Sequence, residues 1–67
     1  MSVARTTEII STSKKSFQDA LEKGVKRATK TLDNVTGAWI KDEDIAIEKG
    51  EIVEYRVRLL VTFVLRD

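Results

Sequence analysis

The sequence predicts an α+β fold in the order strand, helix, strand, strand. Three observations predict it: an alternating apolar pattern near the C-terminus, a helical stripe of apolar residues in the first half, and a Lys-Gly turn between two strand-like segments. Apolar residues at every second position are typical of a strand with one buried face, whereas spacings of three and four are typical of an amphipathic helix. With 67 residues, the chain is expected to form a single domain over positions 1–67.

The first element is expected to be a strand over residues 3–11, which are rich in Val, Ile and Thr. Hydroxyl side chains follow at Ser11, Thr12 and Ser13. Such side chains accept hydrogen bonds from the free N–H groups at the start of a helix. We therefore expect Ser13 to be the N-cap, with Ser11 and Thr12 as alternatives.

The second element is expected to be a helix over residues 14–32. Charged side chains cover most of its surface, and lysines gather toward its C-terminal end, where they complement the helix dipole. A basic binding face and a solvated surface both fit this pattern, and the balanced total charge favours the solvated surface. Gly24 costs up to about 1 kcal/mol relative to Ala, a cost that a close backbone contact would explain. The apolar stripe consists of Phe17, Leu21, Val25, Ala28 and Leu32.

Two strands are expected to complete the chain. Asp33-Asn34 ends the helix, and residues 35–47 form a strand with an acidic interruption at positions 42–44. Lys49-Gly50 provides a hairpin turn into a last strand over residues 51–66, so these two strands are antiparallel. One helix can cover only one face of a three-stranded sheet.

The last strand has a wholly apolar face, which alternates from Tyr55 to Leu65. Its other face carries Leu60 and Val64, more apolar surface than a solvated face usually has. Residues 54–66 would extend about 43 Å as a strand, whereas a compact domain of this size has a radius of gyration of about 11 Å. The strand must therefore curve or reach past its own domain, which favours an assembly over a free monomer.

Composition narrows the functions further. The net charge is +1, which favours neither nucleic acid nor a membrane surface as a partner. No Cys and no His are present, so disulfides, thiolate sites and the usual general base are excluded, and any metal would be a hard cation held by oxygens. An enzyme is not expected. The N-terminus lacks the apolar core of a signal peptide and no apolar run reaches membrane-spanning length, so the default location is cytoplasmic.

The chain resembles the dodecin family over essentially its whole length. The order of elements, the helix start, the helix exit and the third strand carry the resemblance. It implies a sheet curved around the helix and twelve subunits in a hollow homododecameric shell; many dodecins bind and buffer flavins. The matching stretches are Thr12-Ser13, Ala28 to Leu32, Asp33-Asn34-Val35, Glu54-Tyr55-Arg56-Val57 and Val61-Thr62-Phe63.

The resemblance also implies where a flavin would bind. Flavin-binding dodecins have a Trp in the second strand that stacks on the ring and a Gln in the third strand that hydrogen-bonds its polar edge. Gly37 and Arg56 stand at these positions, so classical flavin binding is expected to be weakened or lost. Trp39 lies two positions further on the same strand face. It is interpreted as a subunit contact, as part of a modified flavin or ligand pocket, or as intrasubunit core.

A branch of the family that lacks the flavin Trp and has Tyr-Arg in the third strand is described as calcium-binding, and this chain resembles it more closely. Asp42 and Asp44 share a strand face and offer the oxygens that Ca²⁺ or Mg²⁺ prefers. The alternative is that residues 42–44 form a solvated bend or pair with Arg56, Arg58 or lysines.

These observations leave three functional interpretations. The first is a dodecin-like assembly that binds or stores a small ligand or divalent cation. The second is flavin buffering through a modified pocket, and the third is a purely structural module. The expected subunit contacts are Trp39, Arg58, Leu60 and Val64.

Overall fold

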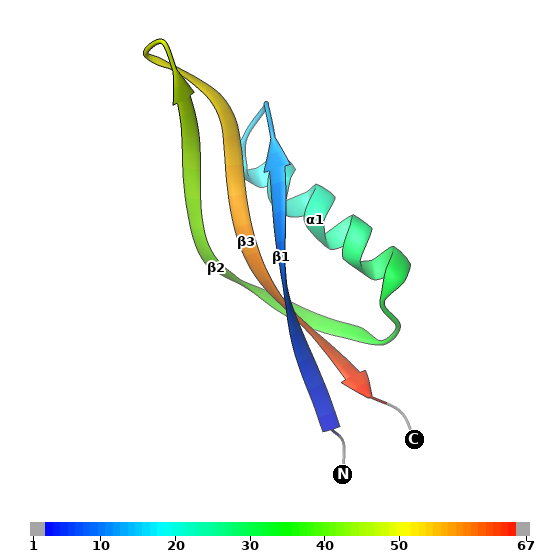
Figure 1. Ribbon diagram of the computed structural model, residues 1–67. Helices are drawn as coiled ribbons and strands as arrows, with labels where there is room; N and C mark the ends of the chain where they lie inside the picture. The colour runs from blue at the N-terminus through cyan, green and yellow to red at the C-terminus, as the bar shows by residue number, and fades with distance from the viewer. Residues whose placement is uncertain (1–2, 66–67) are drawn as a thin grey trace.

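The computed structural model describes residues 3–65 and has the predicted order of elements (Figure 1). These are β1 (Val3–Ser13), α1 (Phe17–Thr31), β2 (Val35–Glu48) and β3 (Glu51–Leu65). The strands form one antiparallel sheet in the order β1-β3-β2. The most apolar strand is therefore central, and β1 and β2 are both edge strands. Residue 66, the predicted end of the third strand, lies outside the described residues.

The helix begins three residues later than predicted. Ser16, not Ser13, is the N-cap, because its side chain accepts a hydrogen bond from the Asp19 N–H at 3.0 Å. Ser11, Thr12 and Ser13 remain in β1, paired with residues 55–57 of β3. The buried Ser13 hydroxyl donates to the Asp19 carboxylate and accepts from the Lys15 N–H at 2.9 Å, so it anchors the turn that precedes the helix.

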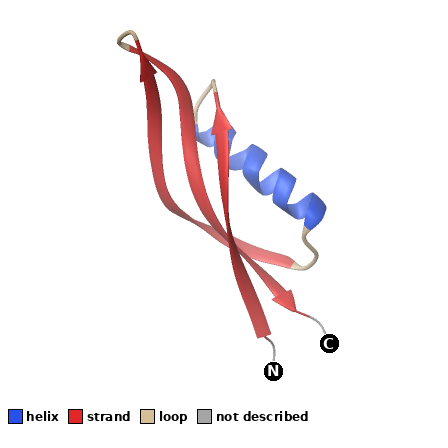
Figure 2. Cartoon of the chain, in the orientation of Figure 1, coloured by secondary structure: helices blue, strands red, loops and turns tan. Residues whose placement is uncertain are grey.

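The core lies between α1 and the alternating face of β3. Val57, Leu59 and Val61 are at most 1% exposed, which confirms the apolar face predicted from the sequence. Figure 2 shows α1 against one face of the curved sheet. The opposite face has no covering layer among the described residues. At the N-terminal end of the helix, Phe17 packs edge-to-face on Tyr55 with ring centroids 5.1 Å apart.

Four residues of the predicted stripe belong to the core or pack against it, namely Phe17, Leu21, Ala28 and Leu32, but the most deeply buried helix residues are small. Ala20, Gly24 and Ala28, spaced by four, are its buried residues, whereas Val25 is exposed. A Cβ built on Gly24 would lie 2.9 Å from Ser11 Cβ and 3.0 Å from a Leu59 methyl. Gly24 therefore sits at the close approach that its cost in helix propensity suggested. These small residues let the helix pack close to β1 and β3. The larger Val25 lies outside this contact and is exposed.

Turns and bulges shape the β2–β3 hairpin. Lys49 and Gly50 both have positive φ, 52° and 80°, as a two-residue hairpin turn of the predicted kind requires. The pairing of β2 with β3 shifts at three places. One of these is a bulge at Lys41, between the pairs Ile40–Leu59 and Asp42–Arg58. Bulges bend a strand, and β2 visibly curves along its length (Figure 1).

The molecule is elongated, with extents of 52 × 19 × 13 Å and a radius of gyration of 13.9 Å. The turn of the β2–β3 hairpin projects past one end of the helix, and the start of β1 lies beside the end of β3 at the other, where Val3 pairs with Leu65 (Figure 1). The last strand thus reaches past the core, as its length predicted. No helix within residues 3–65 is long and apolar enough to cross a membrane.

Candidate functional site

The candidate residues lie on the face of the sheet that α1 leaves uncovered. Cross-strand partners point to the same face, and this face of β3 is the set that alternates with the buried Val57, Leu59 and Val61. Gly37 pairs with Thr62, Trp39 with Leu60, Asp42 with Arg58, and Asp44 with Arg56. The register therefore places the predicted ligand, metal and contact residues on one surface.

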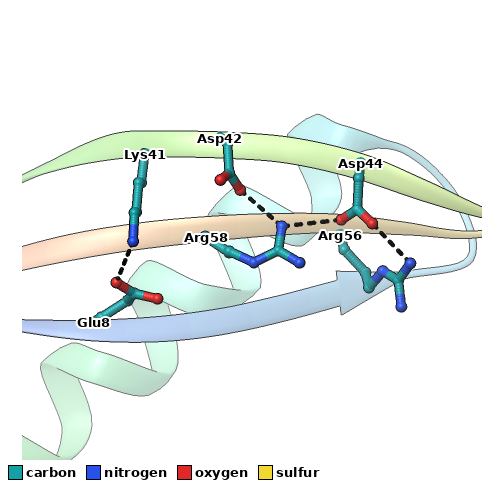
Figure 3. Close-up of polar contacts among 6 residues, drawn as sticks. All are labelled: Glu8, Lys41, Asp42, Asp44, Arg56 and Arg58. Atoms are coloured by element: carbon teal, nitrogen blue, oxygen red, sulfur yellow. Dashed lines mark hydrogen bonds and ion pairs between the residues drawn. The ribbon is translucent and has the colours of Figure 1, made fainter.

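A row of ion pairs occupies this surface (Figure 3). Arg58 Nη1 donates to Asp42 Oδ1 at 2.7 Å and to Asp44 Oδ1 at 3.1 Å. Arg56 Nη2 donates to the other oxygen of Asp44 at 2.7 Å. Two guanidinium groups therefore share Asp44, and a single nitrogen of Arg58 bridges both carboxylates. The prediction that these carboxylates pair with Arg56 and Arg58 is confirmed.

A further ion pair joins the two edge strands. Lys41 Nζ lies 3.0 Å from Glu8 Oε1, and its stem reaches from β2 across β3 toward β1 (Figure 3). Glu8 pairs with Leu60 on β3, and Leu60 pairs with Trp39 on β2. The ion pair thus spans the central strand near the level of Leu60. No sequence signal predicted this pair, because it depends on the bulge at Lys41.

The ion pairs fix the charge state of the central carboxylate. Partial burial raises the pKa of the Asp44 carboxyl, but hydrogen bonds and charge from Arg56 and Arg58 outweigh it and hold that pKa below its usual value. The hydrogen bond and charge of Asp42, followed by those of Asp44, raise the pKa of the Arg58 guanidinium. Both groups are therefore charged at neutral pH.

The same ion pairs limit what one subunit offers a metal ion. Within residues 3–65 no group of three or more acidic side chains is placed to hold a metal. Ca²⁺ takes six to eight oxygens, whereas Asp42 and Asp44 supply at most four, three of which already accept from arginine. These two carboxylates therefore cannot hold Ca²⁺ by themselves, and other copies or water would have to supply the remaining oxygens.

The flavin-type positions do not meet within one chain. Gly37 pairs with Thr62, which lies six residues along β3 from Arg56, a separation of about 20 Å. A pocket containing both positions would therefore combine two subunits. Gly37 has open space around it, because a Cβ built there meets no atom within 4 Å. The absence of a large side chain at this position is thus not imposed by the fold of the single chain.

Trp39 is 52% exposed, so the interpretation as intrasubunit core is wrong. It lies at one side of a groove between α1 and β2 with a volume of about 640 Å³. The exposed Val25 lines this groove, a role that the predicted helix stripe did not reveal. The small residues Ala20, Gly24 and Ala28, at four-residue spacing, were the signal that could have found it. The apolar lining consists of Leu21, Val25, Ala28, Val35, Ala38, Ile40, Leu59 and Val61.

Comparison with known proteins decides the family. The family model described as Dodecin matches residues 3–66. This chain belongs to the dodecin family. Its sequence is 33% identical over 66 residues to the calcium dodecin of Mycobacterium tuberculosis, covering 98% of this chain and 93% of that protein.

Solved dodecins also share the backbone. A crystal structure of the calcium dodecin of M. tuberculosis matches with a TM-score of 0.83 and 34% identity, covering 96% of this chain and 91% of that one. A variant of the Thermus thermophilus dodecin matches with a TM-score of 0.92 and 28% identity over the whole of both chains. The Streptomyces davaonensis dodecin gives 0.91 and 27%, covering 98% and 97%. Identity is thus higher to the calcium dodecin, whereas the backbone agrees better with the other two.

Proposed function

We propose that this dodecin assembles into a homododecameric shell that binds or stores a small ligand or divalent cation, with classical flavin binding weakened or lost. The observation that carries the proposal is the row of Asp42, Asp44, Arg56 and Arg58 on the uncovered face of the sheet. In this row Arg56 stands at the position where, by the resemblance, a flavin-binding dodecin has a hydrogen-bonding Gln. The proposed role is binding, not catalysis.

Exposed apolar side chains support the assembly. Trp39 is 52% exposed and Ile10 61%, and both lie on edge strands whose outer backbone groups have no partner strand in the described chain. A domain this small usually needs disulfides, a metal or oligomerisation for support, and the chain has no cysteine. Trp39, Arg58, Leu60 and Val64 are the proposed contacts on the uncovered face, and Leu60 and Val64 are only half-buried in the single chain.

A divalent cation is the first ligand that we propose, with Asp42 and Asp44 as its protein ligands. The M. tuberculosis relative is named calcium dodecin, and its crystal structure is described as that of a calcium-chelating protein with a novel calcium-binding site. The ionised state of Asp44 suits a hard cation such as Ca²⁺ or Mg²⁺. Arg58 must then release at least one carboxylate oxygen, since its Nη1 lies between the two groups.

Thermal unfolding with and without Ca²⁺ tests this ligand. A ligand that binds only the folded state stabilises it by about 2.7 kcal/mol at one hundred times its Kd. We therefore expect the Tm to rise with Ca²⁺ concentration in the parent protein and to rise less in Asp42→Asn. The proposal of a cation fails if millimolar Ca²⁺ leaves the Tm of the parent unchanged.

Flavin binding through Trp39 is the second candidate, because the residue is half-exposed on the same face as the stacking position. Arg56 has five donors and no acceptor, so it cannot accept from a ring N–H as a Gln carbonyl does. Titration of riboflavin with the protein, followed by flavin fluorescence, tests this alternative. Undiminished fluorescence at micromolar flavin excludes it. If neither flavin nor cation binds, the structural module is the remaining interpretation.

A further inference from the structure

The balanced total charge of the chain conceals two oppositely charged segments. Residues 14–31, which contain α1, carry six basic and two acidic residues, a net charge of +4. Residues 42–54, which contain the hairpin turn, carry six acidic residues and one basic residue, a net charge of −5. The basic segment contains α1, and the acidic segment runs from the second half of β2 into β3 through the turn that projects past the helix (Figure 1).

The end of the β2–β3 hairpin has two features that are unfavourable in the single chain, an exposed apolar pair and a pair of like charges. Ile47 and Ile52 pair across the hairpin and are 60% and 50% exposed. Glu48 and Glu51 pair directly opposite each other and are both exposed. Like charges in opposed positions destabilise a hairpin. The hairpin end therefore carries an apolar pair on one face and an acidic pair on the other, and it projects past the helix.

The groove between α1 and β2 has the complementary chemistry. Its lining is mainly apolar and includes the exposed Val25. Lys26 lines the same groove, and Lys30 follows one turn later on the exposed helix surface. Glu22 also lines it, but its carboxylate accepts a hydrogen bond from Gln18 Nε2 at 2.8 Å, one turn back along the helix.

We propose that the hairpin end of one copy packs into the α1–β2 groove of a second copy. Ile47 and Ile52 then cover the apolar lining of the groove. Glu48 and Glu51 point to the other face of the hairpin. They then lie along the rim of the groove, within reach of the long side chains of Lys26 and Lys30, which relieves the repulsion between the two glutamates. A second copy is the occupant because every copy carries both the hairpin end and the groove. Both surfaces have exposed apolar side chains, and their charges are opposite.

The contact joins two different surfaces, so repetition around a symmetry axis can close it into a ring or shell. This inference rests on the proposed assembly and names the surfaces that meet in it. It predicts that assembly depends on the charges of Lys26, Lys30, Glu48 and Glu51, and that salt weakens it. Raising the salt from 0.1 M to 1 M shortens the screening length from about 10 Å to about 3 Å.

Charge reversal tests the pairing of the segments. Lys26→Glu with Lys30→Glu and, separately, Glu48→Lys with Glu51→Lys are each expected to raise the protein concentration for half-assembly at least about tenfold at 0.1 M salt. Combining all four substitutions is expected to restore assembly, because opposite charges face each other again. Light scattering measures the mass, and circular dichroism checks that each variant is folded.

Lys14→Glu with Lys15→Glu is the matched control. It makes the same change in net charge before the start of α1, outside the groove, and is expected to leave assembly unchanged. The inference is overturned if either reversed pair assembles like the parent, or if the fourfold variant assembles no better than the double variants. The proposed assembly itself fails if the unsubstituted protein has the 7.6 kDa mass of one chain and not about 91 kDa for twelve.

Cross-linking tests the contact directly, since the chain has no cysteine of its own. Copies with Ile47→Cys are mixed with copies with Val25→Cys, dissociated, reassembled and oxidised. A disulfide requires Cα atoms within about 7 Å, so a two-chain product of the mixed copies is expected only if the hairpin end reaches the groove. Ile10→Cys, exposed on the uncovered face, replaces Ile47→Cys in the control mixture. Assembled protein that gives no more product than the control overturns the inference.

Discussion

Gly24→Ala tests whether the close contact between α1 and the sheet is required by the fold. In an open helix position this change stabilises a protein, because Ala has a higher helix propensity than Gly by about 1 kcal/mol. Here the new methyl group would lie 2.9 Å from Ser11 Cβ and 3.0 Å from Leu59 Cδ1. Ser11 Cβ is attached to the backbone of β1 and cannot rotate away, so the helix itself must move.

The structure allows the size of the effect to be bounded. Inserting a methyl group into a well-packed contact costs about 1–3 kcal/mol. Subtracting the gain in helix propensity leaves a net destabilisation of about 0–2 kcal/mol. Gly24→Val should cost more than Gly24→Ala, because it adds two more methyl groups and a β-branched side chain to the same contact.

Urea unfolding followed by circular dichroism measures this effect. Protein concentration must be held fixed, because association and unfolding are linked in an assembly. Gly37→Ala is the matched control, since a Cβ there meets no atom within 4 Å, and it is expected to be neutral or slightly stabilising. The reasoning is refuted if Gly24→Ala raises the free energy of unfolding by about 1 kcal/mol, the gain of an unobstructed helix position.

Three further predictions address the helix start, the ion pairs and the ligand position. Ser16→Ala should lower the free energy of unfolding by about 1 kcal/mol through loss of the N-cap, measured by urea unfolding, whereas an unchanged midpoint would contradict the assigned cap. The pKa of Asp44 is lowered in the folded state, so its stabilising contribution is complete above the ordinary Asp pKa of about 3.9 and is lost as the pH falls through the folded value. Acid unfolding curves should therefore show that Asp44→Asn loses less stability than the parent protein as the pH falls. Identical curves for the two proteins would argue against the ion pairs with Arg58. Gly37→Trp with Arg56→Gln should strengthen riboflavin binding by about 10- to 100-fold over Arg56→Gln alone, measured by fluorescence quenching, since one stacked ring contributes about 1–3 kcal/mol; equal affinities would mean that position 37 does not face the ligand.

The central strand could be predicted in detail because its signal is purely local. The alternation from Tyr55 to Leu65 determines which side chains face the core, and Val57, Leu59 and Val61 are buried as that pattern requires. The Lys49-Gly50 turn is also a local signal, and both residues have the positive φ that the turn needs.

The helix was predicted less well because two of its features depend on tertiary contact. Its start was assigned to Ser13, but β3 pairing holds that residue in β1 and leaves Ser16 as the cap. Its buried face was assigned from large apolar residues, which placed Val25 in the core. Hydrophobic periodicity does not predict how closely a helix approaches a sheet. In this fold the close approach of α1 requires small residues on its buried face.

The candidate site was predictable in its residues but not in its geometry. Strand alternation correctly placed Asp42 and Asp44 on one face, and their pairing with arginines followed from charge. The distance between Gly37 and Arg56 could not be predicted, because it depends on the register between β2 and β3. That register includes shifts that no residue pattern in the sequence marks.

The bulge at Lys41 has a consequence for comparing this chain with its relatives. Trp39 and Asp42 are three residues apart, an odd separation that would put them on opposite faces of a regular strand. The extra residue at the bulge shifts the alternation of side chains along β2 by one position, so Trp39 and Asp42 lie on the same face of the sheet. Deleting Lys41 would turn one half of the strand over relative to the other. A relative without this residue therefore cannot share both halves of the surface, even if its aligned side chains are identical.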